Sequence, residues 1–141
     1  PEESVALGAV QFGRSLSRRT RVPLVLEILS HDLAIVEHMS HRVGVMYVGK
    51  MVELAEKEDM YSDAVHPYTK ALLASVPRPD PDVAMGLTIA GEVASPINPP
   101  TGCRFHPRCP IYEDSEECRE LQPAWDQIAA LHWSACHKVK P

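Results

Sequence analysis

The chain has 141 residues, of which 45% are hydrophobic and 23% are charged. This composition is typical of a globular protein with one modest core and excludes an intrinsically disordered chain. The net charge of −5 argues against a general nucleic-acid binder. No apolar run in the sequence is long enough to cross a bilayer as a helix.

Residues 1–29 form an atypical N-terminal segment that ends in an apolar run, residues 24–29, which predicts a short strand. An arginine-rich stretch, residues 14–21, precedes this run, and a solvated basic surface explains so short a stretch better than a binding site does. The chain starts with Pro1-Glu2-Glu3 and shows no signal-peptide pattern, so we expect a cytosolic location.

The next residues predict a helix followed by a hairpin. Ser30 or Asp32 can cap a helix over residues 33–39, in which apolar side chains recur at helical spacing. Residues 43–48 and 51–54 then predict two strands, joined as a hairpin at Gly49-Lys50.

Residues 44–51 also come close to the phosphate-binding pattern G-x-x-x-x-G-K-[ST]. That loop needs small residues with free backbone N–H groups, whereas the four central residues here are bulky strand formers. Met51 stands where a hydroxyl should hold Mg²⁺. The hairpin is therefore the better interpretation.

Two more helices are expected before the prolines become frequent. Residues 57–63 predict a short acidic helix, and His66-Pro67 begins another with proline in its first turn. We expect the buried side of this second helix to be formed by Ala71, Leu72, Leu73 and Val76.

Residues 77–141 carry ten of the thirteen prolines and all four cysteines. We place a domain boundary near Val76-Pro77, between residues 30–76 and a loop-rich extension, residues 77–141. A small apolar cluster in this extension is expected from Trp125 and Trp133 together with Leu121, Ile128 and Leu131. The predicted fold class is α+β.

The cysteines are the candidate metal ligands. Four thiolates can hold a [4Fe–4S] cluster or a tetrahedral Zn²⁺, and a reducing compartment favours metal over disulfides. The spacings are wider than those of compact zinc modules, which favours the larger cluster, although unlinked thiols or an oxidation disulfide remain alternatives. His106, His132 or His137 could replace one ligand. The four residues are Cys103, Cys109, Cys118 and Cys136.

His31 is the candidate phosphate-contacting residue. It follows an apolar strand, and ligands bind at that end of strands in open α/β sheets, where a neutral imidazole can donate to a phosphate. Taken alone, Ser30-His31-Asp32 more often caps a helix.

Several longer stretches change that interpretation, because together they resemble the tail of an ABC transporter ATP-binding subunit. Residues 30–36 and 41–53 resemble the switch-histidine region of these ATPases. Residues 66–73 and 102–110 narrow the resemblance to the importers of oligopeptides, dipeptides and nickel. The first residues of these four stretches are Ser30-His31-Asp32-Leu33, His41-Arg42-Val43-Gly44, His66-Pro67-Tyr68-Thr69 and Gly102-Cys103-Arg104-Phe105.

The resemblance implies the C-terminal part of an ABC nucleotide-binding domain (switch strand, helix, hairpin, helices) followed by an extension that holds an iron–sulfur cluster in several such subunits. It implies that His31 contacts the γ-phosphate of ATP. It also implies ATP and Mg²⁺ in a complete subunit, and a position on the cytoplasmic face of the membrane beside a second ATPase subunit and transmembrane permeases.

The 141 residues contain no phosphate loop, signature motif or Walker B acid. Residues 1–23 also do not match the segment expected before the switch strand. We therefore expect a partial energy-coupling subunit of a peptide importer without ATPase activity by itself. The alternatives are a stand-alone iron–sulfur or zinc module, and an inert remnant of a truncated transporter gene.

Overall fold

The computed structural model describes residues 33–75, 89 and 91–141. The chain divides into two units, Pro1–Ser40 and His41–Pro141. The expected strand at residues 24–29 and its histidine, His31, lie outside the described residues. No helix in the described ranges has the length and apolar character needed to cross a membrane.

The described part of the first unit is helix α2, Leu33–Met39, which has the predicted bounds. Leu33, Val36 and Met39 are half-buried, whereas Glu37 and His38 are exposed. The apolar spacing predicts this difference in exposure between the two faces of the helix. The predicted helix is therefore confirmed.

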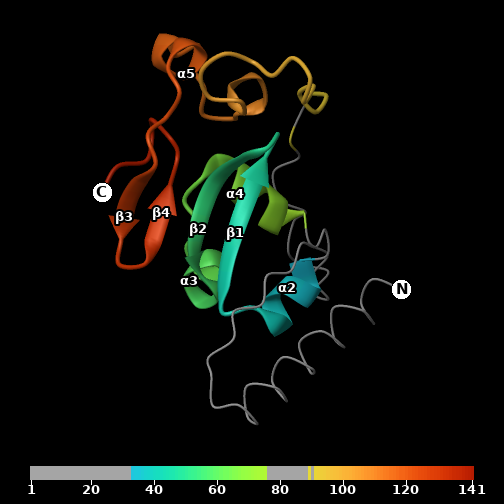
Figure 1. Ribbon diagram of the computed structural model, residues 1–141, viewed down its shortest axis with the longest axis vertical. Coiled ribbons are helices and arrows are strands. Elements are labelled where there is room, and N and C mark those ends of the chain that lie inside the picture. Colours follow the sequence, from blue (N-terminus) through green and yellow to red (C-terminus); the bar gives the residue numbers. More distant parts are fainter. Residues whose placement is uncertain (1–32, 76–88, 90) are drawn as a thin grey trace. The chain divides into compact units, whose positions relative to one another are not determined.

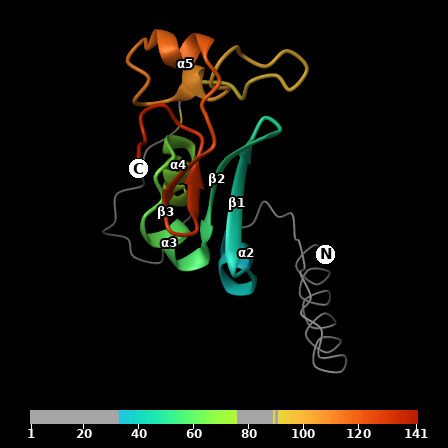
Figure 2. The ribbon, with the colours of Figure 1, turned by 60° about the vertical axis from the view of Figure 1, so that its left-hand side comes forward.

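The second unit contains an antiparallel sheet of four strands in the order β1-β2-β4-β3 (Figures 1 and 2). Side chains of β1 alternate strictly between exposed and buried, which is the pattern of a strand with one covered face. The strands are β1, Arg42–Tyr47; β2, Lys50–Glu56; β3, Asp126–Ala129; and β4, His132–Ser134.

The turn between β1 and β2 confirms the predicted hairpin and rejects the phosphate loop. Tyr47 pairs with Lys50, so the loop is Val48-Gly49, one residue earlier than expected. Both loop residues have positive φ, 45° and 74°, as a two-residue hairpin turn of the I′ type requires. Positive φ is unusual for a β-branched residue, and the Val48 carbonyl is held by a hydrogen bond from Arg104 Nη1.

Two helices follow the hairpin as predicted: α3, Lys57–Ser62, and α4, Pro67–Ala74. Met60 is the buried residue of α3. In α4, Ala71 is buried as expected, Leu72 and Leu73 are half-buried, and Val76 lies outside the described residues. The buried residues of α4 are Pro67, Thr69 and Ala71.

The C-terminal third contains the short 3₁₀ helix η1, His106–Arg108, and helix α5, Glu116–Glu120, besides β3 and β4. Strand β4 pairs with β2, and the amide of Ala135 donates to the carbonyl of Val52 at 2.9 Å. Residues on both sides of the expected boundary at 76–77 therefore share one sheet and one unit. The mixed α+β class is confirmed.

The prediction of an apolar cluster around the two tryptophans is wrong. Leu121, Trp125 and Leu131 are exposed, and Trp133 lies half-buried beneath the guanidinium of Arg42. The segment has too few apolar residues to form a core of its own, so it packs on the core of the sheet instead.

Phe105 carries that packing. It is 1% exposed, and its ring lies 5.2 Å from the rings of both Tyr47 in β1 and Tyr68 in α4. Edge-to-face and tilted contacts at these distances are favourable between aromatic rings. The aromatic contact therefore fixes the cysteine-bearing loops against the sheet and α4.

Candidate functional site

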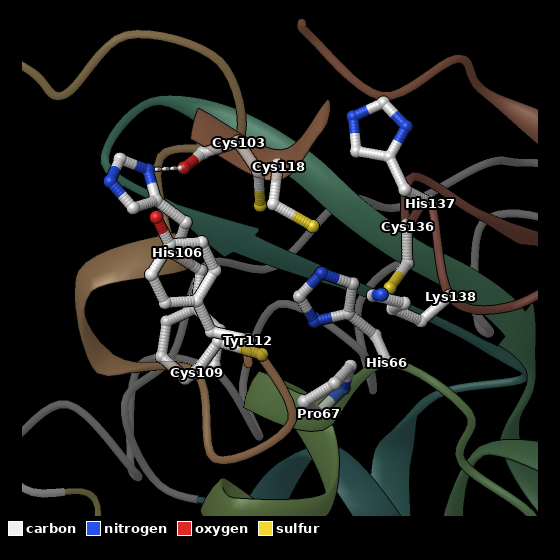
Figure 3. Close-up of a pocket in the computed structure, with 11 residues that line it drawn as sticks. His66, Pro67, Cys103, His106, Cys109, Tyr112, Cys118, Cys136, His137 and Lys138 are labelled. Carbon is white, nitrogen blue, oxygen red and sulfur yellow. Dashed lines mark hydrogen bonds between the residues drawn. The ribbon is translucent and has the colours of Figure 1, made fainter. Parts of the chain in front are cut away.

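All four cysteines line one pocket, which also takes in the imidazole of His66 at the start of α4 (Figure 3). None of the four is in a disulfide. Figure 3 shows the side chains of Cys103, Cys109, Cys118 and Cys136 around this pocket. Residues spaced over 34 positions of the sequence are thus brought to one site by the fold.

A tight contact between the segment Thr101 to Cys103 and helix α5 sets the positions of Cys103 and Cys118. The amide of Cys103 donates to the carbonyl of Cys118 at 2.9 Å, and Thr101 Oγ1 donates to the carbonyl of Arg119 at 2.9 Å. Gly102 between them has φ of +62°, and a Cβ there would lie 2.6 Å from backbone atoms of Cys118 and Arg119. Only glycine fits this crossing.

Local structure also positions the other two cysteines. Cys109 follows η1, and its amide donates to the carbonyl of His106 at 3.2 Å, while the ring Nδ1 of His106 bonds the carbonyl of Cys103 at 2.9 Å. Cys136 comes two residues after β4, next to Ala135, whose amide is anchored on β2. Helix η1 and strand β4 therefore position these two cysteines in the lining of the pocket.

Burial raises the pKa of three of the thiols. For Cys109 the pKa rises to about 11, mainly because of desolvation and to a smaller extent because of the neighbouring cysteines. The pKa values of Cys103 and Cys136 are raised for the same first reason. These thiols therefore stay protonated at neutral pH unless a cation in the pocket compensates the thiolate charge.

The donor chemistry of the pocket fits a thiolate-bound metal, but the side chains do not form a finished ligand set. Among the described residues, no three His, Cys, Asp or Glu side chains are grouped closely enough to hold an ion. A metal would have to draw the four sulfur atoms closer together around it. The assignment of Cys103, Cys109, Cys118 and Cys136 as ligands therefore stays a prediction.

His66 is the functional candidate that sequence reasoning missed. Its side chain is 1% exposed, and its Nδ1 accepts a hydrogen bond from the Tyr68 amide at 3.1 Å, which caps α4. Its Nε2 is buried and has no hydrogen-bond partner among the residues that the structure describes. Burial lowers the pKa of His66 to about 4, against the opposing effects of Glu53 and the Ala135 backbone.

Of the three histidines proposed as substitute ligands, two line the pocket. His106 and His137 do so, whereas His132 is buried elsewhere, with its Nε2 2.8 Å from Glu53 Oε1. His137 Nε2 bonds the carbonyl of Leu121 at 2.9 Å. His132 is therefore a structural partner of a buried carboxylate.

Residues 52–118 match the family described as "Oligopeptide/dipeptide transporter, C-terminal region". Over these residues the chain matches the C-terminal region of that transporter family. The resemblance to this transporter family that the sequence indicated is confirmed. The match includes three of the four cysteines, Cys103, Cys109 and Cys118.

Similar proteins are whole ATP-binding proteins of this transporter family. The chain is 42% identical to the oligopeptide transport ATP-binding protein OppF of Escherichia coli over 98% of the chain and 41% of that protein. It is 46% identical to a probable peptide ABC transporter ATP-binding protein of Sinorhizobium fredii, over 89% of the chain and 35% of the relative. It is 48% identical to the oligopeptide transport ATP-binding protein AppF of Bacillus subtilis, over 77% and 33% respectively.

The chain thus spans about two fifths or less of the length of these transporter relatives. The alignment with the E. coli protein covers 98% of the chain and so includes most of residues 1–29. The N-terminal segment, residues 1–29, which the sequence analysis described as atypical, therefore has a counterpart in that relative.

Proposed function

We propose that the chain is the C-terminal part of the ATP-binding, energy-coupling subunit of a peptide-importing ABC transporter. The observation that carries this proposal is the 42% identity, over 98% of the chain, to a protein named for oligopeptide transport and ATP binding. Residues 30–76 would complete the nucleotide-binding domain, and residues 77–141 would be its extension. The comparisons give no support to a stand-alone metal module.

In the assembled transporter, ATP and Mg²⁺ would bind in the complete subunit, and His31 would contact the γ-phosphate. The partners would be a second ATPase subunit and transmembrane permease subunits, on the cytoplasmic face of the membrane. Phosphoryl transfer needs many groups placed together around the phosphates and Mg²⁺. These 141 residues alone supply one of them.

A replacement experiment tests the proposed role. A chimera of the E. coli OppF protein, with the aligned part exchanged for this chain, is expected to restore oligopeptide uptake in cells that lack OppF. The same chimera with His31→Ala should fail to restore uptake while accumulating to the same level. Failure of the unmodified chimera, expressed and folded at the level of OppF, would contradict the proposal.

The purified chain by itself is expected to show no Mg-dependent ATP hydrolysis, because the phosphate loop and the Walker B acid are absent from its sequence. Phosphate release with and without Mg²⁺ measures this directly. Turnover that depends on Mg²⁺ and disappears in His31→Ala would show that the chain contains a complete catalytic site.

We further propose that the four cysteines hold a metal centre, a [4Fe–4S] cluster in preference to Zn²⁺. The proposal is supported by four free thiols around one pocket and by the small apolar content of the loops that carry them. A bound centre would join these loops at one point and so stabilise them. It would also allow one-electron chemistry if it were the cluster.

Anaerobic loading of the purified chain with iron and sulfide tests this assignment. Four iron and four sulfide per chain with brown absorption are expected, and Cys118→Ser should reduce them sharply. Ser115→Ala, in the same loop, is the control and should load normally. No iron, sulfide or brown colour would exclude the cluster, and one equivalent of zinc instead would establish the alternative.

A further inference from the structure

The imidazole of His66 presents a hydrogen-bond donor to the cysteine pocket that no described residue accepts in hydrogen-bond geometry, although the Ala135 backbone lies near the ring. The side chain is 1% exposed, and its Nε2 is buried without a partner among these residues. Leaving a buried polar group unpaired is unfavourable, so such groups are rare in native proteins and call for a specific explanation.

The other ring nitrogen determines which nitrogen carries the proton. Nδ1 accepts a hydrogen bond from the backbone amide of Tyr68, so it cannot itself carry hydrogen. A histidine with an unprotonated Nδ1 is neutral and has its proton on Nε2. The unpaired atom is thus an N–H donor, which cannot at the same time be a metal ligand.

The direction of this donor is visible in Figure 3. One ring nitrogen of His66 lies toward the beginning of α4, and the other points to the side of the pocket where Cys103 and Cys118 lie. The surrounding walls carry four cysteine sulfur atoms. A protonated thiol is a weak acceptor, whereas a metal-bound thiolate or an inorganic sulfide carries the negative charge that attracts an N–H group.

We propose that His66 donates a hydrogen bond from Nε2–H to a sulfur atom of the metal centre held by the four cysteines. This inference rests on the proposed metal site and assigns His66 as a positioning residue rather than a ligand. A hydrogen bond to sulfur stabilises the more negative, reduced state of an iron–sulfur cluster and so raises its reduction potential.

The experiment compares the iron–sulfur-loaded wild type with His66→Asn. Asparagine keeps an oxygen that can cap α4 in place of Nδ1 but is too short to reach the pocket with a donor. The expected result is unchanged iron and sulfide content with a midpoint potential shifted to more negative values. His41→Asn is the control, since His41 is an exposed histidine that does not line the pocket, and its potential should stay near that of the wild type.

A second measurement covers the case in which His66→Asn fails to fold or load. In wild-type protein with ¹⁵N-labelled histidine, pulsed electron paramagnetic resonance of the reduced cluster should detect one coupled histidine nitrogen. That coupling should persist in both His106→Asn and His137→Asn, the other two histidines of the pocket. An unchanged potential in loaded His66→Asn, or no histidine coupling in the wild type, would overturn the inference.

The loading result separates the two proposals. If the wild type loads the cluster but His66 has no effect, the metal site stands and the role of His66 is wrong. If the chain instead takes zinc, the ¹¹³Cd-substituted protein should show coupling between ¹¹³Cd and the His66 Nε2 proton, and absence of that coupling would reject the role. If the chain binds neither metal, both proposals fail.

Discussion

Glu53 is a carboxylate with no exposed surface, in the middle of β2. It accepts hydrogen bonds from the amides of Val65 at 2.8 Å and His66 at 3.0 Å, and its Oε1 lies 2.8 Å from His132 Nε2. One side chain therefore joins β2, the segment before α4, and β4. Because the group is buried, removing any partner leaves an uncompensated polar atom.

Replacing this carboxylate should be severely destabilising. Glu53→Gln places an amide N–H₂ against groups that already donate, and we expect a loss of about 3–5 kcal/mol in the free energy of unfolding. Urea denaturation of the purified chain measures it. Glu56→Gln, an exposed glutamate of the same strand, is the control and should change stability by less than about 0.5 kcal/mol. Equal effects of the two substitutions would show that the buried network contributes little.

The buried imidazole of His66 should make the metal-free chain sensitive to acid. Its pKa falls from 6.5 to about 4 on folding because of burial, so the folded state binds the proton less readily than the unfolded state does. The stability is therefore complete above about pH 6.5 and is lost as the pH falls toward 4.

Between pH 7 and pH 5 this residue should account for about 2 kcal/mol of lost stability. His66→Asn keeps the helix cap but has no titrating group, so its unfolding free energy should fall by correspondingly less over the same interval. Comparing the two proteins removes the contributions of the other titrating groups. Parallel pH profiles would contradict the assignment.

At the scale of elements, the loop crossing at Gly102 decides whether Cys103 and Cys118 can meet. Gly102 and Gly91 both have positive φ, +62° and +82°. They differ in surroundings, since a Cβ at Gly102 would lie 2.6 Å from backbone atoms, whereas at Gly91 the nearest atom is Arg108 Cγ at 3.8 Å. Comparing substitutions at these two glycines therefore separates the cost of backbone strain from the cost of steric overlap.

Gly91→Ala should therefore cost only the strain of a left-handed residue, about 1–2 kcal/mol. Gly102→Ala should cost clearly more, because its methyl group collides with backbone that cannot yield as a side chain can. Thermal unfolding of the two variants checks the order. Similar losses would mean that the α5 loop moves aside at little cost.

At the scale of the molecule, the described residues from His41 onward form one unit around a sheet that both halves of the sequence build. The amide of Ala135 is bonded to β2, and that of Cys103 to the α5 loop. If the unit unfolds cooperatively, these amides and those of the β1–β2 hairpin open together.

Native-state hydrogen exchange should therefore give similar opening free energies for the amides of Ala135, Cys103 and the hairpin. His132→Gln, which removes the imidazole bonded to Glu53, should lower all three by similar amounts. Two separate values, one for residues before the proline-rich segment and one for those after it, would instead show two independent domains.

The sequence allowed prediction of the local structure because that structure depends on neighbouring residues. Apolar spacing predicted α2, alternation predicted β1 and β2, and Pro67 marked the first turn of α4. The same local logic separated the hairpin from a phosphate loop. It also indicated the cysteines as a group, and the quoted stretches identified the transporter family.

Contacts between distant residues were decided only by the tertiary structure. Nothing in the spacing of the sequence pairs β4 with β2, places Glu53 opposite His132 79 positions later, or packs Phe105 against two tyrosines. From the sequence, His66 was expected only at the start of a helix, and its second nitrogen became notable only when the fold brought the four cysteines around it. Helix and turn preferences act within a few residues, whereas burial and an unpaired donor depend on what the rest of the chain places beside them.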